Sequence, residues 1–356
     1  MASLGTVRSI ADVLSELDVR SLRAAAERAF TLAFASRDVP LAEHLARLLS
    51  HGPRAQDVPL VRVCEVVPLD QAERMQRFDV VVVVAHATGA NHAEFELVRE
   101  LAAAHVPTLV CFIDPPASGL PLRQQWLPAA IASLKTLGDA GNTLDDGEAT
   151  KELVRGIRSL KAIDELALAR HLPAFRPSVS RGLIDDTAVA NAVYSASSGI
   201  LQINPVVGIP LTLADLFVLT KNQALLAYKV ALAMGMTADF RHIMPQLAAV
   251  LGSGFLYRQI ARTLVGIIPG WGILPKVAIA FAGTYATGEA IYRWCATGEQ
   301  LAGEALRQTY DTALARGKSV AAGLLRRRDT GAAQPVARRD KPEPLLPPPP
   351  PPSREG

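Results

Sequence analysis

Four polar side chains follow or lie close behind apolar runs in the first third of the chain, as residues at the ends of buried strands do. His86 follows a run of valines, His92 and Glu94 come shortly after it, and Asp114 follows the apolar run 107–113. Open α/β sheets bind ligands at the carboxyl ends of their strands. Imidazoles and carboxylates gathered there could hold a metal ion or move a proton. The two histidines lack the spacing of a metal motif, so loop polarity is the favoured interpretation and no metal or catalytic residue is predicted.

Composition excludes several classes of function. Cys64, Cys111 and Cys295 are too scattered, and odd in number, for a disulfide framework or a Cys-rich metal site, and we expect them to be small buried residues. The net charge of +3 comes from segment 317–356, which carries net +4, so a basic nucleic-acid-binding face is not expected. Acidic residues among the first apolar positions argue against a signal peptide. A mean hydropathy of +0.20 with 5% aromatic residues indicates membrane contact.

Strand-like and helical segments alternate through residues 1–165, which is typical of a parallel, doubly wound α/β domain. The run 79–85 holds five consecutive valines, as expected of a strand buried on both faces. The other expected strands are 29–35, 59–67 and 107–113. Helices are expected over 1–28, in the leucine-rich stretch 41–49, between the second and third strands, over 92–104 and over about 148–165.

The octapeptide 35–42 (ASRDVPLA) occupies the place of a phosphate loop, G-x-x-x-x-G-K-[ST], directly after the first expected strand. Over residues 25–165 the layout resembles a small GTPase domain of the Era-like or dynamin-like kind. Such a loop cradles phosphates with backbone N–H groups, a lysine and a Mg²⁺-binding hydroxyl. Here the glycines, lysine and hydroxyl are missing, Pro40 has no N–H to donate, and Asp38 would repel a phosphate.

Two further GTPase motifs are also degraded. Of the guanine-reading Asn-Lys-x-Asp only Asp114 remains, and the Asp-x-x-Gly motif is replaced by residues 67–70 (VPLD). The resemblance therefore implies a pseudo-GTPase domain that is unable to bind nucleotide, with no catalytic residue and no cofactor.

The second half of the chain has a different character. Residues 166–186 form a polar, proline-containing stretch, interpreted as a linker, and 187–325 are apolar and expected to be all-helical. The tail 326–356 is basic and proline-rich and is expected to be disordered. Within 211–234, Asp215, Asn222 and Lys229 are spaced seven apart and share one helix face, so this helix should lie on a surface rather than cross a membrane.

A helical hairpin is expected over about 243–292. Arg258 and Arg262 would cost roughly 5–7 kcal/mol in mid-membrane, against about 3–6 recovered by the apolar residues, so a simple crossing is marginal. Residues 269–272 (PGWG) predict the turn, and small residues in the return helix, 275–292, allow close helix packing. The hairpin is either embedded in a membrane or packed on neighbouring helices. Pairing of these arginines with Asp215 or Glu289 would relieve the charge cost.

Residues 187–295 also resemble the bacterial domain of YcjF-like inner-membrane proteins, which often accompanies a GTPase. The resemblance implies membrane association and offers no catalytic residue. The positions that carry it include Ile209-Pro210, Asp215, Gln223, Arg258, Arg262, Pro269, Gly270, Gly283, Thr284 and Gly288.

Together these observations predict a non-enzymatic, membrane-associated scaffold or regulator on the cytoplasmic side of an inner or plasma membrane. It would have a GTPase or another protein as its partner, could oligomerise, and would bind no nucleic acid. The alternative is a soluble regulatory subunit of a GTPase-containing complex, with its apolar helices buried in an oligomer. An enzyme or nucleotide-binding protein that uses unfamiliar contacts is the third, least favoured hypothesis.

Overall fold

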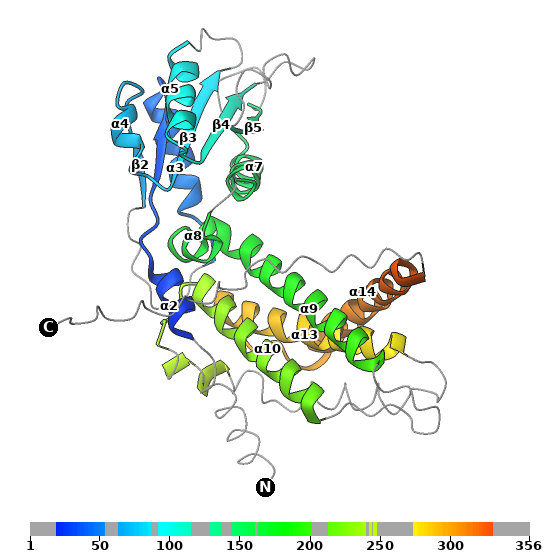
Figure 1. Ribbon diagram of the computed structural model, residues 1–356. Coiled ribbons are helices and arrows are strands. Elements are labelled where there is room, and N and C mark those ends of the chain that lie inside the picture. Colours follow the sequence, from blue (N-terminus) through cyan, green and yellow to red (C-terminus); the bar gives the residue numbers. More distant parts are fainter. Residues whose placement is uncertain are drawn as a thin grey trace, which may run out of the picture.

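A computed structural model shows an α/β part followed along the chain by a helical part (Figure 1). It describes residues 19–53, 63–86, 92–114, 129–136, 144–160, 163–200, 213–239, 242–243, 245–247 and 273–329. The predicted order, a parallel sheet domain and then a helical region, is confirmed.

Five parallel strands form one sheet in the order β2-β1-β3-β4-β5. Strand β3, Val80–His86, lies at the centre, and its five valines are buried on both faces as the sequence predicts. The chain places β2 on one side of β1 and then crosses to β3 on the other, so the strand order reverses between β1 and β3. The other strands are β1 (Leu32–Ala35), β2 (Cys64–Val66), β4 (Thr108–Ile113) and β5 (Ala130–Leu134). Strand β5 is the one that the sequence analysis did not predict.

Helices cover both faces of this sheet. One face packs against α3 (Val39–Leu49) and α7 (Asp146–Arg158), whereas the other packs against α4 (Ala72–Met75) and α5 (His92–Ala103). Alternate residues of each strand enter the two cores, as the two-residue period of a strand requires. Helix α2 (Val19–Glu27) precedes the sheet and packs on the helical part through Ala26.

The interpretation of 166–186 as a plain linker needs correction. This segment contains most of α8 (Glu165–His171), the short 3₁₀ helix η1 (Pro173–Phe175) and the start of α9 (Arg176–Ile200). Pro173 and Pro177 do not interrupt these helices because each lies in a first turn, where no intrahelical N–H is needed. Several of its side chains belong to the core beneath α3 and α7: Ala167, Leu168, Leu172, Phe175 and Val179.

A buried arginine fixes the junction between the two parts. Arg176 is 3% exposed, and its guanidinium donates to the carbonyls of Ala169 (3.2 Å), Arg170 (3.1 Å) and Pro53 (2.8 Å). Beside it, a Cβ added to Gly52 would lie 2.4 Å from the carbonyl oxygen of Pro173, so only glycine permits this approach. The end of α3 is thereby held directly against the start of α9.

The helical part packs around α13 (Ile273–Thr297), which contacts α9, α10 (Leu213–Ala233) and α14 (Gly303–Asp329) (Figure 1). Small residues allow these contacts: a Cβ on Gly317 of α14 would lie 2.7 Å from the carbonyl oxygen of Ala278 in α13. Among the described residues, none of the helices combines the length and hydrophobicity that a membrane crossing requires. Most of the expected hairpin, including residues 248–272, lies outside the described residues.

Candidate functional site

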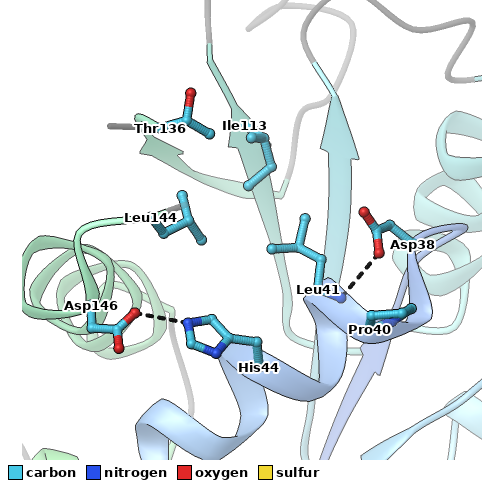
Figure 2. A pocket seen from close by; sticks show the side chains of 8 residues that line it. All are labelled: Asp38, Pro40, Leu41, His44, Ile113, Thr136, Leu144 and Asp146. Atoms are coloured by element: carbon cyan, nitrogen blue, oxygen red, sulfur yellow. Dashed lines mark hydrogen bonds and ion pairs between the residues drawn. The ribbon is translucent and has the colours of Figure 1, made fainter. Parts of the chain in front are cut away.

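A cavity of about 500 Å³ opens at the carboxyl edge of the sheet (Figure 2). This is the edge at which doubly wound sheets bind ligands, and the volume lies within the range of small-molecule sites. One wall comes from the start of α3, with Asp38, Pro40, Leu41 and His44. The opposite wall comes from the ends of β4 and β5 and from the start of α7, with Ile113, Thr136, Leu144 and Asp146.

The first turn of α3 is capped by a side chain of the protein itself. Asp38 is the N-cap, and its Oδ1 accepts a hydrogen bond from the backbone N–H of Leu41 at 3.0 Å. Pro40 lies in the same turn and has no N–H. Phosphate-binding helices use these N–H groups and their positive dipole to hold an anion. Here a carboxylate occupies that position, which agrees with the sequence-based interpretation of Asp38 and Pro40.

Asp114 directly follows β4 and has a left-handed conformation, with a φ of 49°. Its two carboxylate oxygens accept hydrogen bonds from the backbone N–H and the hydroxyl of Thr136, at 2.8 and 2.7 Å. The backbone hydrogen bond and then the hydroxyl are the main causes of the lowered pKa of Asp114. The one residue that matches a base-reading motif is therefore engaged within the protein.

His44 of the α3 wall and Asp146 of the opposite wall meet, with His44 Nε2 2.8 Å from Asp146 Oδ1 (Figure 2). An imidazole oriented by a carboxylate can act as a general base when a nucleophile lies beside it. Among the eight lining residues, the only hydroxyl is that of Thr136, and it donates to Asp114. This pair can therefore bind and orient a ligand, but it presents no activated nucleophile.

None of the other polar residues expected at this edge lines the cavity. Glu94 is 3% exposed, and its Oε1 lies 3.0 Å from Nε of Arg37. His86 ends β3 and His92 begins α5. In the part of the chain that the structure describes, no group of three histidine, cysteine or acidic residues could hold a metal ion.

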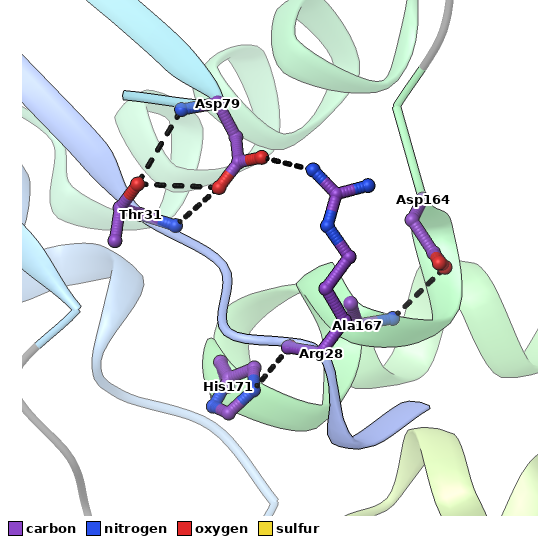
Figure 3. Close-up of polar contacts among 6 residues, drawn as sticks. All are labelled: Arg28, Thr31, Asp79, Asp164, Ala167 and His171. Atoms are coloured by element: carbon purple, nitrogen blue, oxygen red, sulfur yellow. Dashed lines mark hydrogen bonds and ion pairs between the residues drawn. The ribbon is translucent and has the colours of Figure 1, made fainter. Parts of the chain in front are cut away.

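The amino edge of the sheet is closed by polar contacts (Figure 3). Asp79 accepts hydrogen bonds from the backbone N–H of Thr31 (2.8 Å), from its hydroxyl (3.2 Å) and from Arg28 Nη2 (2.6 Å). The Nε2–H of His171 donates to the carbonyl of Arg28 at 3.0 Å, and burial lowers the pKa of His171. These contacts bind the segments that follow α2 and end α8 to the start of the sheet.

The cysteines behave as small interior residues. Cys111 and Cys295 are buried, as expected, and Cys64 is half-buried; all three are free thiols. Burial raises the pKa of the Cys64 and Cys295 thiols to about 12, and it also raises the pKa of Cys111. They are therefore protonated at neutral pH and are poor nucleophiles.

In the helical part, the predicted position Thr284 belongs to a buried hydrogen-bond network. The Asn191 amide donates to the Thr284 hydroxyl at 2.8 Å, and the Asn222 amide donates to Asn191 Oδ1 at 2.6 Å. Gly283 and Gly288 are also buried, and a Cβ on Gly288 would lie 2.5 Å from Ile184 of α9. These three positions thus act in helix packing. On the helix face that the sequence predicts for Asp215, Asn222 and Lys229, Asn222 contacts Asn191 of α9.

The remaining predicted positions are distributed differently. Asp215 and Gln223 lie in α10, and Gln223 is half-buried. Glu289 is half-buried in α13; burial raises its pKa, and Arg181 is its main opposing charge. Its predicted pairing with Arg258 or Arg262 is untested, because both arginines lie outside the described residues. Four other predicted positions also lie outside them: Ile209, Pro210, Pro269 and Gly270.

Sequence reasoning missed three polar residues of the cavity: His44, Thr136 and Asp146. Thr136 follows β5, whose sequence has little strand character. A strand predicted at 130–134 would have placed Thr136 at the carboxyl edge of the sheet. Asp145 and Asp146 directly precede a helical pattern, a signal that indicates a helix start but no cavity.

Comparisons with protein-family models, curated proteins and solved structures found no match to this chain. The GTPase-like and YcjF-like resemblances therefore rest on the residues quoted above.

Proposed function

We propose that this protein is a non-enzymatic scaffold or regulator whose α/β domain is a degenerate GTPase-like domain that binds no nucleotide. The Asp38 cap on α3 is the observation that carries this proposal, because it places a negative charge where a phosphate loop would place N–H donors. The strand order alone supports only a doubly wound fold, which hosts many functions. The GTPase-like assignment depends on the positions of segments 35–42, 67–70 and 111–114.

Electrostatics at the carboxyl edge supports the same proposal. Asp38, Asp114 and Asp146 all lie at this edge, and Leu41 stands at the position of the phosphate-loop lysine. Two like charges 4 Å apart repel by about 1 kcal/mol in water and about 4 kcal/mol near a protein surface. A triphosphate would therefore meet repulsion at several points.

Isothermal titration calorimetry with GTP and GDP in the presence of Mg²⁺ tests the proposal. We expect no saturable heat from the full-length protein. The Asp38→Asn variant keeps a helix cap but removes its charge. It should also fail to bind, because the lysine and glycines are missing too. Micromolar affinity that requires Mg²⁺ would overturn the assignment.

For the helical part we propose membrane association on the cytoplasmic side. The support comes from sequence: the segment 243–262, which is apolar apart from Arg258 and Arg262, and the basic residues Arg326–Arg328 at the end of α14. Each lysine or arginine near an anionic membrane surface contributes about 1 kcal/mol. Flotation with vesicles that contain anionic lipid should recover the protein, and replacing Arg326–Arg328 by glutamate should reduce the recovery. Equal recovery of both proteins would contradict an electrostatic contribution to membrane contact.

A second candidate, a regulatory subunit whose apolar helices are buried in protein contacts, is favoured by the packing of α13. Its apolar side chains Val277, Ala278 and Phe281 are at most 2% exposed, against α9, α14 and neighbouring residues. A carbonate wash of cell membranes separates the two proposals. Protein retained in the pellet supports membrane association, and protein that never fractionates with membranes supports the subunit.

A further inference from the structure

We propose that the cavity at the carboxyl edge binds a small organic cation, namely a protonated amine carried on a compact apolar body. Two carboxylates face this cavity from opposite walls, and the surface between them is apolar (Figure 2). Nothing in the proposed function assigns a ligand to this site. The inference depends on that function in one respect, because it requires the edge to be free of nucleotide.

The apolar surface is built from interior residues. Ile113 and Leu144 are 2% and 8% exposed, and Leu41 is partly buried against the same core. These side chains come from β4, from the segment after β5 and from α3, so their positions are fixed by the sheet and its helices. A ring or short alkyl chain placed between them would lose contact with water, which favours binding.

The polar groups give the cavity a negative balance. Asp38 uses Oδ1 for the cap, and no described cation pairs with it, since the adjacent Arg37 lies against Glu94. The carboxylate of Asp146 has a single described partner, His44. Two carboxylates thus oppose one imidazole, which attracts a cation and repels an anion. An ammonium group can donate a charge-assisted hydrogen bond to either carboxylate.

An organic cation fits these walls better than a metal ion. The two carboxylates belong to opposite walls, and no set of three potential metal ligands gathers among the described residues. A metal ion needs several ligands at short, fixed distances. An amine needs only one carboxylate for its charge and an apolar surface for its body.

A series of three probes with the same phenyl group tests the proposal: 2-phenylethylamine, 2-phenylethanol and 3-phenylpropionate, which are cationic, neutral and anionic. Binding to the full-length protein is followed by ligand-observed NMR at millimolar probe. We expect saturable binding of the amine, weaker binding of the alcohol, and none of the acid. Added salt should weaken the binding of the amine, because it screens the charge of the carboxylates. No saturable binding of the amine, or equal binding of the acid, would overturn the proposal.

Variants locate the site. Asp38→Asn keeps the α3 cap, and Asp146→Asn can still accept from His44, so both should fold while losing one charge. The variant that removes the carboxylate bound to the ammonium group should weaken binding of the amine about tenfold, the value of one hydrogen bond to a charged group, and the other variant should weaken it less. Asp164→Asn is the matched control, because Asp164 caps α8 outside the cavity; it should bind as the wild type does. Unchanged affinity in both cavity variants would refute this location.

The two proposals fail in different experiments. Binding of GTP with Mg²⁺ would contradict the proposed function, whatever the amine does. If the amine does not bind, the ligand proposed for the cavity is wrong, but the proposal that the domain binds no nucleotide still stands.

Discussion

Replacing Arg176 by methionine is expected to destabilise the protein strongly, although methionine fills a similar volume. The Arg176 guanidinium is buried at the junction of the α/β and helical parts and donates to three carbonyls, those of Ala169, Arg170 and Pro53. Methionine removes all of these donors. The contact with Ala169 is buried and those with Arg170 and Pro53 are part-buried, so water can replace the guanidinium only in part.

The magnitude follows from these three contacts. A carbonyl left without a partner in the interior costs about 1–3 kcal/mol, so the gross loss is roughly 3–9 kcal/mol. Removing the buried cation also removes its desolvation cost, which offsets part of that loss. A net destabilisation of about 3–5 kcal/mol remains, which is a large fraction of the roughly 5–15 kcal/mol that keeps a typical protein folded.

Equilibrium unfolding in urea, followed by circular dichroism, measures this change. Arg155→Met is the matched control, because Arg155 is an exposed residue of α7 whose described partner is Glu152, one turn away. The control should change stability by less than about 0.5 kcal/mol. Arg176→Lys should fall in between, since an ammonium cannot match the planar guanidinium fork. If Arg176→Met stays within about 0.5 kcal/mol of the wild type, Arg176 does not hold the junction.

Two further predictions concern helix packing and the strand end at β4. Gly317→Ala should destabilise the folded protein by about 1–3 kcal/mol, because the new Cβ meets the backbone of Ala278. Gly323→Ala, in the same helix, adds a Cβ that meets nothing within 4 Å, so it should stabilise the folded protein by about 0.4–1 kcal/mol. Thermal unfolding of the two variants checks this pair, and equal shifts would contradict the close α13–α14 contact. The hydrogen bonds from Thr136 lower the pKa of Asp114 in the folded state. Their contribution to stability is therefore fully present above the ordinary pKa of an aspartate, and it is lost as the pH falls through the lowered pKa. Thr136→Val should therefore raise the pKa of Asp114 toward its ordinary value, which a carboxyl ¹³C NMR titration measures; an unchanged titration would show that the hydroxyl does not act on this carboxylate.

The sequence predicts the centre of the sheet well, because burial on both faces demands a continuous apolar run such as the valines of β3. Strand β5 was missed for the opposite reason. Its sequence AIASL contains one β-branched residue and a serine, so only pairing with β4 reveals it as a strand. Local pattern is strongest where burial is complete and weakest at a sheet edge.

The helical segment at 166–186 was misinterpreted because two prolines suggest an interruption. Proline breaks a helix interior but not a first turn, and the sequence alone did not show where the turns begin. Asn222 shows a similar limit. Its spacing from Asp215 and Lys229 correctly predicts a shared helix face, but not the contact with Asn191, which depends on how α10 packs against α9.

The cavity was predictable only in part. Asp38 and Pro40 were recognised because a phosphate loop fixes their place in the sequence. His44 and Asp146 are about a hundred residues apart, and only the packing of α3 against α7 brings them together.

The central claim, that the α/β domain binds no nucleotide, is tested most directly by thermal unfolding of the full-length protein with and without GTP and Mg²⁺. A ligand present at about 100 times its Kd stabilises the folded state by about 2.7 kcal/mol, which shifts the unfolding midpoint measurably. With Asp38 capping α3 and Asp114 held by Thr136, the midpoint should be the same with GTP, with GDP and with neither. A midpoint that rises with GTP concentration, and only when Mg²⁺ is present, would contradict the account.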